Sequence, residues 1–181
     1  MWLNERGSAF FYLQIVTCKV IITSEVNMTM CVGIDPGCSG ALVLMGYMGG
    51  YIDHLNMPTI KVGTKSRVNG AAVAAWLRDY QIGHAYLEQV GAMPGQGTAS
   101  MFTLGHAAGV VEGILQGLNI PYTLVTPQAW KKSAGLIGSD KDAARSRAIQ
   151  LYPELRALDA KAKGQAIADA LLIARYGAGL K

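Results

Sequence analysis

Charged residues and cysteines are scarce in this chain of 181 residues. Asp, Glu, Lys and Arg make up only 15% of it and hydrophobic residues 51%, a balance that excludes a wholly disordered chain. The three cysteines, Cys18, Cys31 and Cys38, include no Cys-x-x-Cys pair and have no histidine at metal-ligand spacing. This excludes a disulfide framework and a zinc site, and we expect a reducing, cytoplasmic environment.

Several sequence signatures of enzymes are also missing. No Walker A sequence is present, and Gly95-Gln96-Gly97 lacks the third glycine of the dinucleotide fingerprint. His54, His84 and His106 have no nucleophile at a recognisable spacing, which leaves a Ser-His-Asp or Cys-His hydrolase unsupported. The length fits one ordinary domain, so two-domain kinases and large ATPases are excluded.

Residues 1–27 differ from the rest of the chain. The apolar run Ala9–Val16 is too short to span a bilayer and no small-residue cleavage site follows it, so we expect neither a membrane anchor nor a secretory signal. We interpret 1–27 as a weakly ordered, dispensable leader, such as an upstream extension of the reading frame, and 28–181 as the folded domain. A strand or helix added at an edge is the open alternative.

Positive charge is concentrated toward the C-terminal third. The chain carries 16 Lys and Arg against 12 Asp and Glu, a net charge of +4. From Gln128 onward there are ten basic residues and five acidic ones. This excess permits a polyanionic partner such as nucleic acid without proving one.

The order of the expected elements favours an α/β domain. Glycine-rich breaks divide the first part into three short strands that should pair as an antiparallel meander, at 31–35, 41–45 and 51–55. A Pro- and Gly-containing loop is expected at 56–67. Further strands are expected at 84–88 and 122–126, and helices at 68–80, 99–118, 140–152 and 165–176. Strands first, then strands alternating with helices, predict a mixed sheet flanked by helices.

Four glycines recur at every fourth position of the helix expected at 99–118: Gly105, Gly109, Gly113 and Gly117. One helix face therefore carries no side chains, and because glycine costs about 1 kcal/mol in a helix, a packing reason is expected. We expect this face to seat tightly on the sheet or on another helix, with a homodimer contact as the main alternative.

Three carboxylates stand where metal ligands are commonly mounted. Asp35 ends an apolar strand directly before Pro36, and Glu88 ends the apolar run 85–87. Asp169 lies on the apolar stripe of the last expected helix, and burying a carboxylate is costly unless it is paired or holds a cation. Two neighbouring strand ends and a crossing helix would bring these oxygens together for Mg²⁺.

Each carboxylate also has an ordinary interpretation. Asp35 would serve as a turn aspartate that satisfies its own backbone, and Glu88 as a surface residue at a strand exit. Asp169 would act as a favourable charge near a helix N-terminus.

Four sequence blocks follow one another in order: 33–37 (Gly-Ile-Asp-Pro-Gly), 87–89 (Leu-Glu-Gln), 126–132 (Thr-Pro-Gln-Ala-Trp-Lys-Lys) and 167–174 (Ile-Ala-Asp-Ala-Leu-Leu-Ile-Ala). Together they resemble the RuvC-like Holliday-junction resolvases of bacteria and phages, within the ribonuclease H-like superfamily. The resemblance covers about residues 30–176. It implies a ribonuclease H-like nuclease domain at 28–181, with a mixed five-stranded sheet, an antiparallel meander plus parallel strands, flanked by helices, and a homodimer.

The resemblance also implies a crossover junction endodeoxyribonuclease that acts in DNA recombination and repair with two Mg²⁺ ions, for which Mn²⁺ can substitute. Asp35 would bridge the metals, Glu88 would bind from the neighbouring strand, and Asp169 would close the site. The family's fourth carboxylate, about one turn before the last acid, is missing. Gln165, on the same helix face as Asp169, could offer a carbonyl oxygen or hold a metal-bound water. Asp159 is a second substitute if the preceding segment folds back.

Basic residues are expected to hold branched DNA by its backbone phosphates. The candidates, with one aromatic neighbour, are Lys61, Lys65, Arg67, Trp130, Lys131, Lys132, Lys141 and Arg145. A solvated basic face is the alternative interpretation.

Three functions compete on the sequence alone. The first is a metal-dependent nuclease for four-way DNA junctions. The second is a relative of the same fold that binds branched DNA and cuts weakly or not at all, because the fourth acid is missing. The third is a sugar-kinase or actin-like ATPase, since Asp35-Pro36-Gly37 also looks like that superfamily's phosphate loop. Those enzymes need a second such domain and a second phosphate loop, which we do not find.

Overall fold

The computed structural model describes residues 30–92, 95–140 and 142–180. Two expectations fall outside the described residues, namely the leader at 1–27 and the DNA contact of Lys141.

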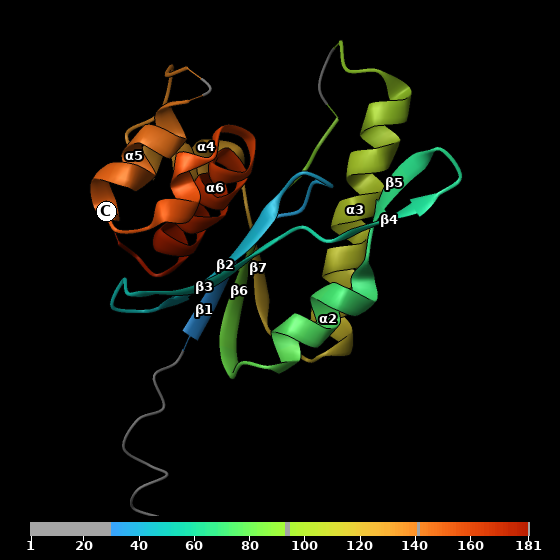
Figure 1. The fold of residues 1–181 in the computed structure, drawn as a ribbon, viewed down its shortest axis with the longest axis horizontal. Helices are drawn as coiled ribbons and strands as arrows, with labels where there is room; N and C mark the ends of the chain where they lie inside the picture. The colour runs from blue at the N-terminus through green and yellow to red at the C-terminus, as the bar shows by residue number, and fades with distance from the viewer. Residues whose placement is uncertain (1–29, 93–94, 141, 181) are drawn as a thin grey trace, which may run out of the picture.

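A five-stranded mixed sheet forms the centre of the domain (Figure 1). The strands lie in the order β3-β2-β1-β6-β7, with the bounds β1 Met30–Asp35, β2 Ala41–Gly46, β3 Tyr51–Asn56, β6 Ile82–Glu88 and β7 Tyr122–Val125. The β1–β2 and β2–β3 pairs are antiparallel, whereas the β1–β6 and β6–β7 pairs are parallel. The predicted meander followed by parallel strands is therefore confirmed.

Helices cover both faces of this sheet (Figure 1). One group, on the right of the view, is formed by α2 (Gly70–Arg78) and α3 (Thr98–Gly117). The other group contains α4 (Pro127–Ser133), α5 (Ala143–Leu151) and α6 (Lys161–Gly177), with the 3₁₀ turn η1 (Arg156–Asp159) before α6. Within the described ranges, no helix combines the length and apolar character needed to cross a bilayer.

The central strand β1 contributes side chains to two separate cores. Val32 and Ile34 pack in the core that includes Leu115 of α3, whereas Cys31 packs in the core that includes Leu171 of α6. Successive side chains of a strand point to opposite faces, and here both faces are covered. This explains why β1 reads as a continuous apolar run instead of an alternating one.

Gly33 allows α6 to lie directly on β1. A Cβ atom at position 33 would stand 2.1 Å from the carbonyl oxygen of Ala170 and 2.4 Å from the nitrogen of Ala174, so no side chain fits there. This close approach places the residues just before Ala170 next to the C-terminal end of β1, where Asp35 lies.

The segment expected as a loop at 56–67 is instead largely a β-hairpin. Strands β4 (Thr59–Val62) and β5 (Lys65–Val68) pair antiparallel, and Gly63 takes a positive φ of 61° in the tight turn between them. Ile60 and Val62 are 47% and 53% exposed. The hairpin was not predicted because Ile60 and Val62 do not face a core, which removes most of the usual burial signal of a strand.

The predicted packing of the α3 glycines is wrong within the described part of the chain. A Cβ atom at Gly105, Gly109, Gly113 or Gly117 would have no neighbour within 4 Å. The helix buries a different stripe, which includes Val111. The glycine face of α3 is thus open. It does not seat on the sheet or on another helix among the described residues, and the homodimer contact remains as the expected reason for the repeat.

Candidate active site

Three elements bring the predicted carboxylates to one end of the sheet. Ile34 of β1 and Leu87 of β6 are register partners in a parallel pair, so the next residue of each strand, Asp35 or Glu88, leaves the sheet at the same edge. Asp169 of α6 directly precedes Ala170, whose carbonyl lies over Gly33 of β1. The electrostatic influence of Asp35 and Glu88 on Asp169 shows that the three groups are close in space.

Asp35 is held by the turn that follows β1. The Gly37 amide donates a hydrogen bond to its Oδ1 at 3.3 Å, and Gly40 N–H donates to the Gly37 carbonyl at 2.8 Å. Burial raises the pKa of Asp35 above its ordinary value, and the Gly37 hydrogen bond only partly opposes this. The turn aspartate interpretation therefore describes part of its contacts, but one weak hydrogen bond does not compensate for its burial.

Glu88 is held by a tryptophan. The Trp130 indole Nε1–H donates to Glu88 Oε1 at 2.8 Å, and the following Gln89 amide donates to the Val125 carbonyl at 2.8 Å. Burial is the main reason why the pKa of Glu88 is raised; the Trp130 hydrogen bond lowers it, the charge of Asp35 raises it, and Lys131 lowers it. A surface glutamate at a strand exit would show neither the bond nor the burial.

Asp169 has the most perturbed carboxyl group of the three. Its pKa is raised from 3.8 to about 7, first by burial and then by the charges of Asp35 and Glu88. Gln165 Nε2 donates to Asp169 Oδ1 at 3.0 Å, and this bond and the Lys131 charge act in the opposite direction. The repulsion among the three carboxylates is thus incompletely balanced.

Gln165 lies one helical turn before Asp169, where the sequence suggested a substitute for the missing acid. With its Nε2 donating to Asp169, its Oε1 is buried and has no hydrogen-bond partner in the structure. An unsatisfied buried acceptor is costly, and a donor or a cation would relieve that cost. Asp159 takes another position, in an exposed ion pair with Arg156 at 2.9 Å on η1.

A pocket of about 310 Å³ opens beside Asp169 and Gln165. Its other lining residues come from α4, α5 and the connection between them: Lys131, Leu136, Ser139, Asp140 and Ala144. Sequence reasoning did not single out Asp140, because a lone acid in a loop carries no periodic signal. The pocket gives Asp169 and Gln165 access to solvent.

The basic candidates occupy two separate places. Lys131 and Lys132 are exposed on α4, and the Lys131 ammonium lies 5.3 Å from the Trp130 ring centroid. Lys61, Lys65 and Arg67 lie on the β4–β5 hairpin, and we call these three the basic hairpin residues. Their hairpin lies beside α3, on the side of the sheet opposite to α4 (Figure 1).

Two of the predicted DNA contacts do not face outward. Trp130 is only 2% exposed, so it presents no surface on which DNA could pack. The Arg145 guanidinium is partly buried, and its Nη1 donates to the Leu158 carbonyl at 3.4 Å. Burial of the indole and the turn of Arg145 toward η1 mean that neither side chain is displayed for DNA as Lys131 and Lys132 are.

The carboxylates do not form a closed metal cage as they stand. Across residues 30–92, 95–140 and 142–180, no group of three or more His, Cys, Asp or Glu side chains is arranged to hold a metal ion. The donor chemistry nevertheless suits a hard divalent cation, because all three groups are carboxylates and the adjacent buried Gln165 oxygen lacks a partner. The residues therefore fit a divalent cation by the type of ligand atom that they offer. A complete site requires their side chains to move closer to one another.

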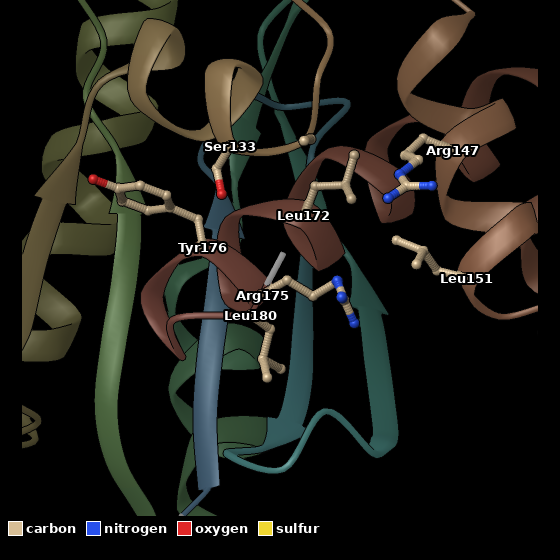
Figure 2. A pocket seen from close by; sticks show the side chains of 8 residues that line it. Ser133, Arg147, Leu151, Leu172, Arg175, Tyr176 and Leu180 are labelled. Atoms are coloured by element: carbon tan, nitrogen blue, oxygen red, sulfur yellow. The ribbon is translucent and has the colours of Figure 1, made fainter.

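A much smaller pocket lies farther along α6 (Figure 2). Its volume is about 10 Å³, which is about the space of one water molecule. Figure 2 shows Arg147, Arg175 and Tyr176 around it, and none of the three carboxylates lines it. It is separate from the candidate active site.

Two solved structures from Thermus thermophilus share this fold. The structure described as "T. thermophilus RuvC in complex with Holliday junction substrate" matches with a TM-score of 0.58 and 17% identity, over 82% of this chain and 91% of that chain. The "Thermus thermophilus RuvC structure" matches with a TM-score of 0.53 and 17% identity, over 82% and 95%. Neither a protein-family model nor a curated protein sequence matches this chain. The chain has the ribonuclease H-like fold of RuvC, as the sequence resemblance implied.

Proposed function

We propose that this chain with a RuvC-like fold is a metal-dependent endodeoxyribonuclease that cuts four-way or otherwise branched DNA. The observation that carries the proposal is the meeting of Asp35, Glu88 and Asp169 at one sheet edge, where burial and the charges of Asp35 and Glu88 raise the pKa of Asp169 to about 7. A protein gains no stability from three crowded carboxylates unless something positive joins them. One of the two structures of the same fold is described as a complex with a Holliday junction substrate.

Asp35, Glu88 and Asp169 would hold two Mg²⁺ ions, or Mn²⁺ in their place, with the Gln165 Oε1 as a neutral additional ligand. Such ions, when bound, activate a water molecule and neutralise the charge of the phosphate and the leaving oxygen. The chain supplies the orientation of the ligands. The Gly37 amide holds Asp35, the Trp130 indole holds Glu88, and Gln165 holds Asp169.

The two basic groups would bind the DNA backbone on either side of the carboxylates. Lys131 and Lys132 lie next to the site on α4, and the basic hairpin residues extend from the opposite side. Positive side chains neutralise phosphates and release counterions, so binding should weaken steeply as salt is added. Two positive regions flanking one cutting site suit a DNA with more than one arm.

The open glycine face of α3 supports the homodimer that the resemblance implied. Gly109 and Gly113 are exposed with free space above them, and Phe102, on the same helix, is 62% exposed. Side-chain-free helix faces allow two helices to approach closely. A second copy of the chain would supply the packing reason that the single chain lacks.

Cleavage of a labelled mobile four-way junction is the direct test. The full chain is incubated with this junction and, in parallel, with linear duplex, in Mg²⁺, Mn²⁺ or EDTA. We expect paired, metal-dependent cuts confined to the junction. Asp35→Asn should lose cutting while junction binding in EDTA stays near that of the unaltered chain. Metal-independent cutting, or equal cutting of linear duplex, would contradict the proposal.

A binding protein without nuclease activity is the second candidate, and Gln165 is the observation that favours it. Its amide occupies the place of a fourth carboxylate and contributes no charge toward a cation. Tight, salt-dependent junction binding with no product in either metal would select this alternative.

A further inference from the structure

Trp130, which the sequence placed among the candidate DNA contacts, is buried. It is 2% exposed and belongs to a small core whose other buried members are Val125, Ala144, Leu172 and Ile173. That core joins β7, α4, α5 and α6. Leu172 and Ile173 follow Asp169 by about one helical turn, so the indole packs against the helix that carries this carboxylate.

The single hydrogen-bond donor of this buried ring is used on the candidate active site. An indole has one N–H group, and that of Trp130 donates to Glu88 Oε1 at 2.8 Å. No other hydrogen bond to the Glu88 carboxylate occurs among the described residues, so this bond alone fixes its orientation. A ring locked by packing on several elements is a rigid donor, unlike a water molecule or a lysine.

The segment around Trp130 is itself firmly placed. Pro127 begins α4, and the Thr126 hydroxyl accepts from the Ala129 amide at 3.3 Å as the helix cap. The Lys131 ammonium lies 5.3 Å from the indole centroid, which keeps its charge near Glu88 and Asp169.

We propose that Trp130 is a positioning residue that holds Glu88 in the orientation needed to bind a divalent cation together with Asp35 and Asp169. This inference rests on the proposed nuclease function for its purpose, although the contact it concerns can be tested without DNA. It reassigns Trp130 from contacting DNA to orienting a metal ligand. Residues that orient metal ligands through hydrogen bonds typically change metal affinity or activity by about 10–100-fold when they are altered.

The chain contains a matched control. Trp76 of α2 donates its indole N–H to Asp53 Oδ2 at 3.2 Å, on the other side of the sheet and outside the carboxylate cluster. Trp76→Phe and Trp130→Phe therefore remove the same kind of bond from the same kind of ring. Only the second is expected to act on cation binding.

The first experiment follows the indole N–H signals of the full, ¹⁵N-labelled chain by NMR. Trp2→Phe and Trp76→Phe assign two of the three tryptophan signals, and the remaining one belongs to Trp130. Glu88→Ala should move the Trp130 signal and leave the Trp76 signal in place. Titration with Mg²⁺ alone should also move the Trp130 signal, since the cation draws on the same carboxylate. An unchanged Trp130 signal in Glu88→Ala would overturn the proposal without requiring any variant of Trp130 to fold.

The second experiment measures Mn²⁺ binding by calorimetry, with melting temperatures measured in EDTA. We expect Trp130→Phe to bind Mn²⁺ about 10–100-fold more weakly than Trp76→Phe, which should match the unaltered chain. Equal Mn²⁺ affinity of the two variants would refute positioning.

If the unaltered chain fails to cut junctions but the Trp130 signal responds as expected, the proposed function fails and the positioning role stands. If the chain cuts junctions but the Trp130 signal does not shift in Glu88→Ala, the proposed function stands and the positioning role fails.

Discussion

Neutralising Asp169 should stabilise the metal-free protein at pH 8 even though it removes a proposed metal ligand. The pKa of Asp169 is raised from 3.8 to about 7, so the folded chain retains a proton that the unfolded chain has already lost. Stability of the metal-free protein therefore falls as pH rises from about 4 to about 7, and it stays reduced above that range. Asp169→Asn keeps an acceptor for Gln165 and removes the charge.

The size of the effect follows from the pKa. A rise from 3.8 to about 7 corresponds to about 4 kcal/mol at roughly 1.36 kcal/mol per pKa unit. Solvent screening at this partly exposed carboxylate reduces the expected gain of Asp169→Asn to about 2 kcal/mol at pH 8. For a domain of this size that is a rise in melting temperature of roughly 4–8 °C, which should nearly vanish at pH 4.

Thermal unfolding in EDTA at pH 4 and pH 8 checks this, and Asp53→Asn is the control of opposite sign. Burial acts to raise the pKa of Asp53, but hydrogen bonds from Tyr80, the His54 backbone and Trp76, together with the charge of His54, outweigh it and hold that pKa below its ordinary value. Asp53→Asn should therefore destabilise the protein at pH 8. Adding Mg²⁺ should stabilise the unaltered chain more than Asp169→Asn. If Asp169→Asn lowers the melting temperature in EDTA at pH 8, the three carboxylates do not repel one another as inferred.

Three further outcomes are expected. Gln165→Asp should lower the Mg²⁺ concentration needed for half-maximal cutting and reduce stability in EDTA, because it replaces a donor to Asp169 by a like charge; cutting assays over a metal series and melting in EDTA measure both. Replacing all three basic hairpin residues by alanine should weaken junction binding and reduce the slope of log affinity against log salt by up to about 3, at roughly 0.9 per phosphate contact, as measured by fluorescence anisotropy. Gly109→Ala should stabilise the isolated chain by up to about 1 kcal/mol, because the open face accepts a methyl group, and should weaken self-association in sedimentation analysis. An unchanged sedimentation profile in Gly109→Ala would remove the α3 face from the homodimer.

The sheet and the three carboxylates could be predicted because their signals are local and strong. The apolar strand followed by Asp35-Pro36-Gly37 indicates both a strand end and a mounted carboxylate, and the structure places it at the end of β1. Glu88 and Asp169 were inferred in the same way, from an apolar run and an apolar stripe. Local patterns of this kind survive folding because buried strands and helices impose them.

The parts that could not be predicted depend on which surface meets which partner. The sequence shows that Trp130 follows a helix cap beside two lysines, a pattern that suits a DNA-facing residue as well as a buried one. Only the packing of α4 against α6 decides that its indole points to Glu88. The four-residue glycine repeat likewise specifies a bare face but not what lies on it, and the start of α6 at Lys161, before the predicted 165, reflects contacts with η1.

The hydrogen bonds of the site bear on the cations that we propose for it. Each of the three carboxylates accepts one N–H bond from an uncharged group, namely the Gly37 amide, the Trp130 indole and the Gln165 amide. Lys131 is the basic residue that acts on both Glu88 and Asp169. Neutral donors orient carboxylates without cancelling their charge, and one ammonium cannot neutralise three. Under the proposed function, divalent cations would supply the missing charge, and Gln165 in place of a fourth acid would lessen the repulsion to be overcome before they bind.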